Sequence, residues 1–272
     1  MSLLTPMMRT SPLTAWFSDA QRVQGMLDFE AALARAQVEC GLVPQAALNP
    51  IIESCRHENI DFSALGQAAA SAGNLAIPLV KQLTARVKQR DDAAARYVHW
   101  GATSQDAIDT GFILQLRGAL EETDSLLQQL LDALAHQAAR YQDTVMPGRT
   151  WMQHALPVTF GLKLAGTLDA LLRWQVRLRE MRSRVLALQF GGAAGTLDSL
   201  KTQAPRIAGA LAKTLDLQLP DAPWHSQRDR LLEVGAWYAG VCGTLPSCAA
   251  ATAGSISAKP AAEASSARRA VK

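Results

Sequence analysis

The longest regular feature of the sequence is an apolar repeat between residues 109 and 142. Apolar side chains recur there at steps of three and four, with Thr123 and Gln137 at two skipped positions: Ile113, Leu116, Leu120, Leu127, Leu130, Leu134 and Tyr141. This spacing places one apolar stripe along a helix of about nine turns. A stripe of that length needs long partner helices to cover it, so we expect a helical bundle.

Other segments supply helices of suitable length. We predict four of them, over residues 20–40, 157–190, about 197–215, and from about Ser226 onward. Pro157 stands where proline is favoured, in the first turn of a helix. Alternating β-branched runs and Asn-Gly turns are nearly absent, so the sequence predicts an all-α fold.

The chain divides into three parts by its pattern. We predict an N-terminal helical domain over residues 1–108, an incomplete central helical bundle over 109–245, and a low-complexity tail over 246–272. Ten of the 27 tail residues are Ala and five are Ser, and the apolar periodicity stops at Leu245. Such a composition is typical of a disordered segment. An out-of-frame reading of the gene is the other interpretation.

Charge and composition exclude several classes of protein. The chain has 27 basic and 24 acidic residues, and the whole excess lies in the tail, since residues 1–245 carry 23 of each. A neutral body has no basic footprint for nucleic acid. No apolar run is long enough for a bilayer, the N-terminus lacks a signal-peptide pattern, and the four cysteines show no metal or disulfide spacing. We therefore expect a cytoplasmic protein without a nucleic-acid or membrane partner.

The first of three polar stretches is HWGATSQDAIDT, residues 99–110. Thr103 or Ser104 can cap the long helix, and Asp106 follows Thr103 by three residues as in a capping box. Free backbone N–H groups and two hydroxyls at a helix start can also hold a carboxylate. Taken alone, this stretch favours plain capping.

The second stretch, GRTWMQHALPVTFG over residues 148–161, gathers polar groups where we expect a buried helix to begin. Arg149 could bind a carboxylate with two hydrogen bonds, or pair with Asp143. His154 is either a satisfied histidine or a functional one. The third stretch, WHSQRDR over residues 224–230, reads alone as an ion-pair cluster at a helix start.

Motifs for other chemistry are absent from the sequence. It contains no metal-ligand cluster, no phosphate-binding glycine loop, no carboxylate pair and no nucleophile elbow. If the protein is an enzyme, this absence favours acid–base chemistry without a cofactor.

The three stretches, in this order and separated by long helices, resemble the fumarase/aspartase superfamily. The resemblance runs from about residue 9 to Leu245 and includes MLDFEAALARAQVECGLVP and GNLAIPLVKQL. It implies a bundle of the fumarase/aspartase type and a homotetramer whose active sites combine segments of three subunits. It also implies cofactor-free chemistry on di- and tricarboxylates through a carbanion.

Within the superfamily, the motifs resemble the 3-carboxymuconate cycloisomerase branch, which serves aromatic catabolism through the β-ketoadipate pathway. Trp151 stands where adenylosuccinate lyases carry a catalytic histidine, and a tryptophan cannot shuttle protons. The resemblance therefore implies lactonisation of a small tricarboxylate. An adenylosuccinate-lyase-like enzyme and a non-catalytic helical fragment or oligomerisation module are the alternatives.

The resemblance also implies roles for individual residues. Thr103 and Ser104 are expected to hold a substrate carboxylate, with His99 near them. A second wall is expected to consist of Trp151, Gln153 and His154, and Arg149 is a further candidate for binding substrate. His99 and His154 are both candidates for the proton donor, and the sequence does not choose between them.

One superfamily feature is missing from the sequence. The signature loop Gly-Ser-Ser-x-x-Met-Pro-x-Lys-x-Asn-Pro, which carries a catalytic serine, does not occur. We therefore expect the 272-residue chain on its own to have little or no activity.

Overall fold

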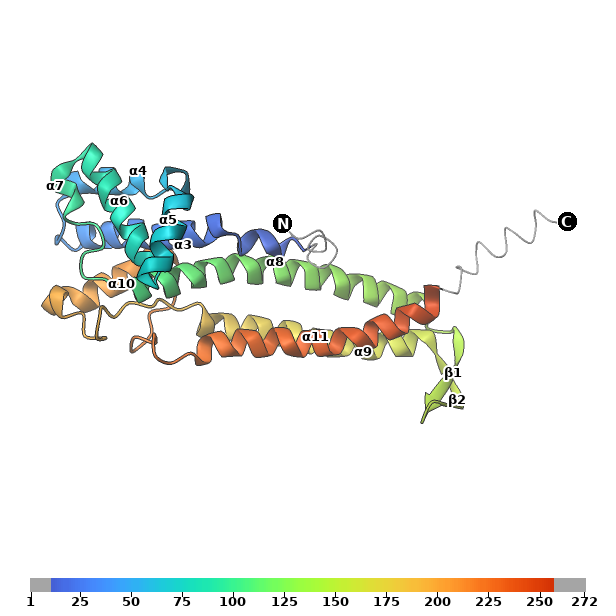
Figure 1. Cartoon of the computed structure of the whole chain (residues 1–272). Helices are drawn as coiled ribbons and strands as arrows, with labels where there is room; N and C mark the ends of the chain where they lie inside the picture. Colours follow the sequence, from blue (N-terminus) through green and yellow to red (C-terminus); the bar gives the residue numbers. More distant parts are fainter. Residues whose placement is uncertain (1–10, 257–272) are drawn as a thin grey trace. The chain divides into compact units, whose positions relative to one another are not determined.

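The computed structural model of the chain describes the backbone of residues 11–256 and the side chains of residues 11–245 (Figure 1). Within these residues the fold consists of helices and one two-stranded sheet. The elements, in chain order, are α2 (Leu13–Trp16), α3 (Asp19–Glu39), η1 (Gln45–Ala47), α4 (Leu48–Ser54), η2 (His57–Asn59), α5 (Phe62–Ala72), α6 (Ala76–Arg90), α7 (Asp92–Ala95), α8 (Ser104–Arg140), β1 (Val145–Thr150), β2 (Gln153–Thr159), α9 (Phe160–Val185), η3 (Asp198–Gln203), α10 (Ala204–Leu215) and α11 (Asp229–Ile256).

The mostly helical fold that the sequence predicted is confirmed. Helix α3 matches the expected segment closely, and α8 contains most of the predicted long helix. The stripe of α8 is buried at five of the seven predicted positions: Ile113, Leu116, Leu120, Leu127 and Leu134. Leu131, rather than Leu130, is buried between the last two of them. Periodicity therefore predicts the packed face of this helix well.

The prediction that a helix begins at Pro157 is wrong, because residues 145–159 form a β-hairpin. Strands β1 and β2 pair antiparallel, with Pro147 opposite Pro157, and α9 begins three residues later than predicted, at Phe160. The two turn residues, Trp151 and Met152, have φ of 50° and 58°. Turns of this kind normally carry Asn or Gly, so the sequence lacks the usual hairpin signal.

The described residues divide into two compact units. Unit 1 comprises the described residues up to Glu122 together with Arg182–Leu231, and unit 2 comprises Thr123–Met181 together with the described residues from Leu232 onward. These bounds differ from the predicted boundary between residues 108 and 109, and the predicted domain assignment stays a prediction.

In unit 1, α10 packs against α3, and α3 crosses the first half of α8 at two glycines. A Cβ atom on Gly25 would lie 2.5 Å from the carbonyl oxygen of Gly111, so the crossing requires residues without side chains. The close approach brings α3 against the start of α8. That contact positions the polar side chains of the site.

In unit 2, α9 and α11 lie side by side (Figure 1). The indole of Trp174 donates to Thr244, and the indole of Trp237 donates to the Trp174 carbonyl. The two rings meet edge to face with centroids 6.5 Å apart. Gln175 of α9 donates to Gln128 of α8 at 2.8 Å, so three helices make up the core of this unit.

The predicted tail is only partly described. The backbone of α11 continues to Ile256, past Leu245, where the sequence predicted that the helix ends. The side chains of residues 246–256 and all of residues 257–272 lie outside the described part, so the low-complexity tail stays a prediction.

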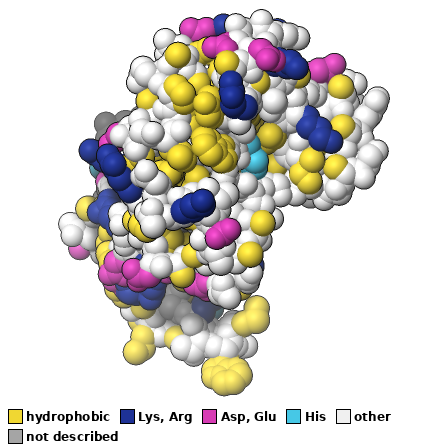
Figure 2. Space-filling view, turned by 90° about the vertical axis from the view of Figure 1, so that its left-hand side faces the viewer, with side chains coloured by type: hydrophobic (Ala, Val, Ile, Leu, Met, Phe, Trp, Pro, Cys, Tyr) yellow, Lys and Arg dark blue, Asp and Glu magenta, His cyan; other side chains and the backbone are white. Residues whose placement is uncertain are grey.

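On the face drawn in Figure 2, basic and acidic side chains are mixed among hydrophobic ones. This mixture agrees with the neutral body inferred from the sequence. Among the described residues, no helix is long and apolar enough to cross a membrane.

Candidate functional site

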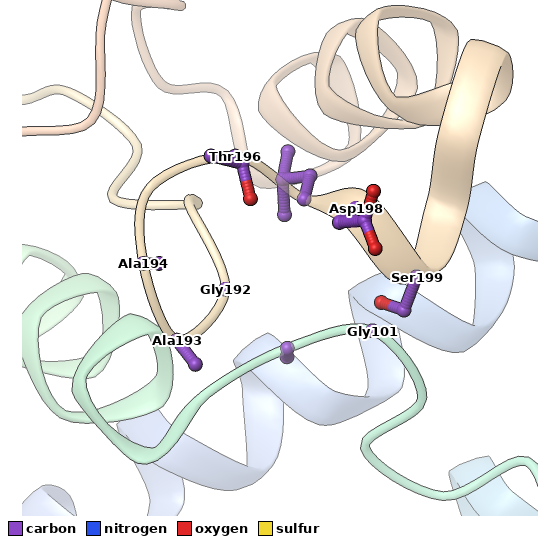
Figure 3. A pocket seen from close by; sticks show the side chains of 9 residues that line it. Gly101, Gly192, Ala193, Ala194, Thr196, Asp198 and Ser199 are labelled. Carbon is purple, nitrogen blue, oxygen red and sulfur yellow. The ribbon is translucent and has the colours of Figure 1, made fainter.

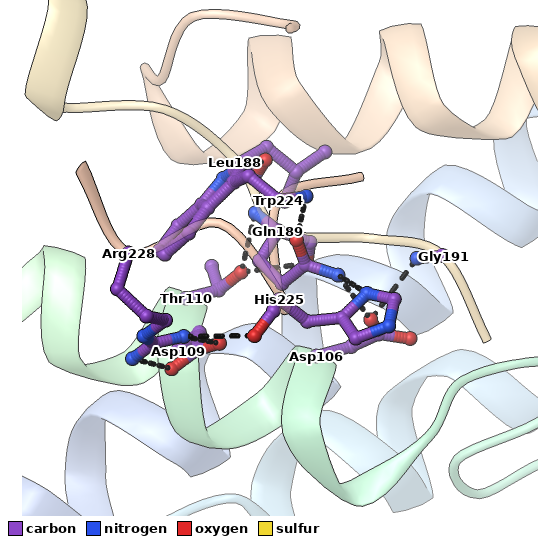
Figure 4. A network of polar contacts seen from close by, with 9 residues as sticks. All are labelled: Asp106, Asp109, Thr110, Leu188, Gln189, Gly191, Trp224, His225 and Arg228. Atoms are coloured by element: carbon purple, nitrogen blue, oxygen red, sulfur yellow. Dashed lines mark hydrogen bonds and ion pairs between the residues drawn. The ribbon is translucent and has the colours of Figure 1, made fainter. Parts of the chain in front are cut away.

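The carboxylate of Asp106 lies at the centre of a buried polar network in unit 1 (Figure 4). It accepts hydrogen bonds from the backbone N–H groups of Thr103, Gly191 and Gly192 and from the side chain of Gln189, all at 2.9–3.0 Å. Burial raises the pKa of Asp106, while these four hydrogen bonds act in the opposite direction. One side chain thus joins the loop before α8 to the glycine loop after α9.

Gln189 extends the network toward the third polar stretch of the sequence (Figure 4). Its backbone exchanges two hydrogen bonds with the hydroxyl of Thr110, and its side-chain oxygen accepts from the backbone N–H of Trp224 at 2.6 Å. Its amide nitrogen lies 3.4 Å from Nδ1 of His225. Because Gln189 is completely buried, these contacts fix the position of the segment that follows Pro223.

Arg228 anchors the same segment to α8. Its guanidinium forms two hydrogen bonds to the buried carboxylate of Asp109, at 2.7 and 3.0 Å. The guanidinium also lies over the ring of Trp224, 5.5 Å from its centroid. The stretch that the sequence alone indicated as a solvated ion-pair cluster is therefore tied to the start of α8.

The loop over residues 99–103 is held from a second side by α3. Glu30 approaches Nδ1 of His99 at 2.5 Å, and Gln37 donates to the carbonyl of Trp100 at 2.6 Å. His99 and Gly101 both have positive φ, of 59° and 81°. A histidine in the left-handed region is uncommon, so its neighbours hold the backbone there.

Thr103 and Ser104 stand at the first turn of α8, as the sequence predicted. The backbone N–H of Thr103 donates to Asp106, which is half of a capping box, and the hydroxyl of Ser104 accepts from Asn74. The Thr103 hydroxyl makes no hydrogen bond within the described residues. The capping that the sequence favoured is therefore supplied mainly by Asp106.

A cavity of about 350 Å³ lies beside this loop (Figure 3). It is lined by Gly101, Ala102, Gly192, Ala193, Ala194, Thr196, Leu197, Asp198 and Ser199. Small side chains on both loops leave the room, because glycine and alanine fill so little of it. The loop of residues 191–196 curls around one side of the cavity, and Asp198 and Ser199 close the other (Figure 3).

The second polar stretch forms the hairpin of unit 2. Arg149 pairs with His154 and Thr150 pairs with Gln153 in the register of β1 and β2. The side chains of Arg149, Gln153 and His154 are exposed, and Trp151 at the tip is 96% exposed. Arg149 makes no ion pair within the described residues, with Asp143 or any other carboxylate.

Comparison with known proteins gives one consistent result. A family model described as "Lyase" matches residues 7–257. The chain belongs to this lyase family. The membership agrees with the resemblance to the fumarase/aspartase superfamily.

Several individual proteins share a high sequence identity with this chain. A 3-carboxy-cis,cis-muconate cycloisomerase from Pseudomonas aeruginosa is 57% identical over 235 residues, which cover 86% of this chain and 51% of the relative. One from Bradyrhizobium diazoefficiens is 49% identical over 89% of this chain and 54% of the relative. The crystal structure of a 3-carboxy-cis,cis-muconate lactonizing enzyme from Pseudomonas putida superposes with a TM-score of 0.88 at 52% identity. That alignment covers 90% of this chain and 56% of the solved one. The chain thus spans about half the length of the relatives it matches.

The predicted site residues of this lyase-family chain fall into two groups. His99, Thr103 and Ser104 lie together in unit 1, while Arg149, Trp151, Gln153 and His154 lie together on the hairpin of unit 2. Their combination in one active site stays a prediction. Within the described residues, no group of three or more His, Cys, Asp or Glu side chains could hold a metal ion.

Sequence reasoning missed three buried side chains that shape the site: Glu30, Gln37 and Gln189. A signal existed for the first two. Glu30 and Gln37 fall on the apolar stripe of α3, where a polar residue needs a partner. Gln189 gave no such signal.

Proposed function

We propose that this chain contributes to the active site of a 3-carboxy-cis,cis-muconate cycloisomerase, which converts its tricarboxylate substrate to 4-carboxymuconolactone. The observation that carries the proposal is the 57% identity to a relative of that name. The distribution of buried polar contacts supports it, because Asp106 and Gln189 tie together two of the three stretches that resemble superfamily motifs, residues 99–110 and 224–230.

The proposed reaction is an intramolecular addition. An oxygen of one substrate carboxylate forms a bond to a carbon of the conjugated diene and closes the lactone ring. The displaced π electrons move to the carbon next to another carboxylate, which holds them as an aci-carboxylate. A proton is then delivered to that carbon, so no atom is lost and no redox partner is needed.

Two groups of residues have roles in this proposal. Thr103 and Ser104, at the N-terminus of α8, hold a substrate carboxylate where the positive end of the helix dipole favours negative charge. Arg149, Trp151, Gln153 and His154 form the second wall. The proton comes from His99 or His154.

The proposal includes the surroundings that the superfamily implies. The enzyme is a cytoplasmic homotetramer without a cofactor, and it acts in aromatic catabolism on the β-ketoadipate pathway. The signature loop is absent from the sequence, so we expect turnover only where another polypeptide segment supplies that loop.

A chimera tests the proposal directly. Residues of this chain replace the 235-residue segment that they match in the P. aeruginosa relative, and lactonisation is followed by the loss of muconate absorbance. We expect kcat/KM within about tenfold of the intact relative, because the catalytic groups are supplied by both parts. A folded chimera without lactonisation would contradict the proposal.

Two variants of the chimera separate the alternatives. Thr103→Val keeps the side-chain shape and removes the free hydroxyl, so we expect at least a tenfold loss of kcat/KM. Trp151→His introduces the histidine that adenylosuccinate lyases carry at this position. We still expect no release of fumarate from adenylosuccinate, because the rest of the pocket is unchanged. Fumarate release would favour the lyase alternative, and full activity of Thr103→Val would remove its hydroxyl from the site.

A further inference from the structure

The pairing of His99 with Glu30 is unusual for a structural contact. Glu30 lies on the buried face of α3, with its side chain 2% exposed, and it approaches Nδ1 of His99 at 2.5 Å. Burying a carboxylate costs several kcal/mol unless it is paired, and pairing requires an imidazole that donates from Nδ1. The contact therefore fixes which nitrogen of His99 carries a proton.

Glu30 uses only one of its two side-chain oxygens in this pairing. Its second oxygen, Oε2, is buried and has no hydrogen-bond partner among the described residues. His99 is therefore the one hydrogen-bond partner of Glu30 in the described chain, and the backbone of His99 is held at a φ of 59°.

The other ring nitrogen of His99, Nε2, is the one that remains for proton transfer. Nε2 has no hydrogen-bond partner within residues 11–245, and it is not among the buried unsatisfied atoms of that segment. Nε2 is therefore not fully buried, and the side chain as a whole is 18% exposed. His154, by contrast, lies on an exposed strand and has no carboxylate partner in the described chain.

We propose that Glu30 is a positioning residue that holds His99 through Nδ1–H, so that Nε2–H of His99 delivers the proton to the carbanion. The inference rests on the proposed lactonisation and extends it by choosing His99 over His154. It assigns Glu30 a role through His99 and no contact with substrate.

Electrostatics support this arrangement. The charged groups that face His99 are Glu30 on α3 and Asp106 on α8. Burial lowers the pKa of His99, but the hydrogen bond and charge of Glu30, with the charge of Asp106, outweigh it and raise the pKa above the ordinary 6.5. The protonated form of His99 is thus more favoured than that of an ordinary histidine.

The first test uses the 272-residue chain itself. Long-range proton–nitrogen spectra follow the five histidines during a pH titration, and His99→Gln assigns the His99 signal by its loss. We expect Glu30→Gln to lower the titration midpoint of His99 and Glu30→Asp to restore part of the shift. The matched control is Glu53→Gln, which removes an exposed partner of Arg90. An unchanged His99 midpoint in Glu30→Gln would overturn the proposal.

The second test places the same variants in the chimera. With Glu30→Gln we expect kcat at neutral pH to fall about tenfold or more, part of the 10²–10⁴ that a proton donor contributes. The decline of activity with rising pH should begin at lower pH, and Glu30→Asp should recover part of the rate. A shifted His99 midpoint with an unchanged pH profile would overturn the catalytic role alone. An inactive unsubstituted chimera would contradict the proposed function. The coupling of Glu30 to His99 would then be decided by the pH titration in the spectra alone.

Discussion

The loop before α8 and the hairpin of unit 2 have similar polar sequences but opposite surroundings. Three buried side chains of neighbouring helices hold the loop: Asp106 of α8 binds Thr103, and Gln37 and Glu30 of α3 bind Trp100 and His99. On the hairpin, Trp151 is 96% and Met152 92% exposed. The loop is organised by its own unit, whereas the hairpin tip receives no packing from its own unit.

This difference separates two ways of building a site wall. A wall held by buried polar contacts couples function to stability, so a substitution there affects both. A wall of exposed side chains on a hairpin can change with little effect on folding. The comparison therefore predicts where stability and activity should respond together and where they should separate.

The largest effect should come from the buried face of α8 in unit 2. Leu127 is 6% exposed, so Leu127→Asp places an unpaired charge among packed side chains and should cost about 3–5 kcal/mol. Trp151→Asp, at the hairpin tip of the same unit, should change the free energy of unfolding by less than about 0.5 kcal/mol. Chemical denaturation measures both. Equal losses of stability in the two variants would mean that the hairpin tip is packed as closely as the core of unit 2.

The next effect concerns the hub of the loop. Asp106→Asn keeps the shape, but an amide N–H₂ in the place of Oδ2 would face the backbone N–H groups of Thr103 and Gly192 and leave both without an acceptor. We expect a loss of about 2–4 kcal/mol in denaturation experiments. Asp143→Asn, before the hairpin, is the matched control and should cost less than about 0.5 kcal/mol. An unchanged free energy of unfolding in Asp106→Asn would show that Asp106 does not organise the loop.

The two regions also differ in how far sequence predicts them. Helices α3 and α8 follow from apolar spacing, because burial of one face decides their position. The hairpin was missed because Trp151 and Met152 replace the residues that normally mark such a turn, and because Pro157 suits the first turn of a helix as well as an edge strand.

The site is predictable to a similar extent. Thr103, Ser104 and Asp106 follow from the capping pattern, and Glu30 stands out as a charge on an apolar stripe. The identity of its partner does not follow, since Glu30 and His99 are 69 residues apart in sequence. Gln189 and Asp106 are 83 residues apart, and only the packed fold brings them together.

A smaller effect should appear in the pH dependence of stability. The folded-state pKa of His99 is raised above 6.5, so its contribution is fully present below that pH and is lost as pH rises through the folded pKa. The free energy of unfolding should therefore decline as the pH rises above about 6.5 and passes through the folded pKa of His99. Glu30→Gln should flatten this decline, while His154→Gln on the exposed hairpin should leave it unchanged. A flat profile in the unsubstituted chain would contradict the coupling of Glu30 to His99.

The smallest effect should be an increase in stability at the hairpin tip. Trp151 and Met152 hold positive φ without being Asn or Gly, which costs backbone energy, and neither side chain regains that cost by burial in its own unit. Replacing them with Trp151→Asn and Met152→Gly supplies the preferred two-residue turn and should stabilise the chain by about 0.5–1 kcal/mol. In the chimera the same double variant should lose lactonisation, since Trp151 is proposed to line the second wall. Thermal denaturation and the absorbance assay measure the two outcomes. A less stable variant would show that the tip packs within its unit, and retained lactonisation would remove Trp151 from the wall. An increase in stability together with a loss of activity is the result expected of a turn whose residues serve binding at the expense of its own geometry.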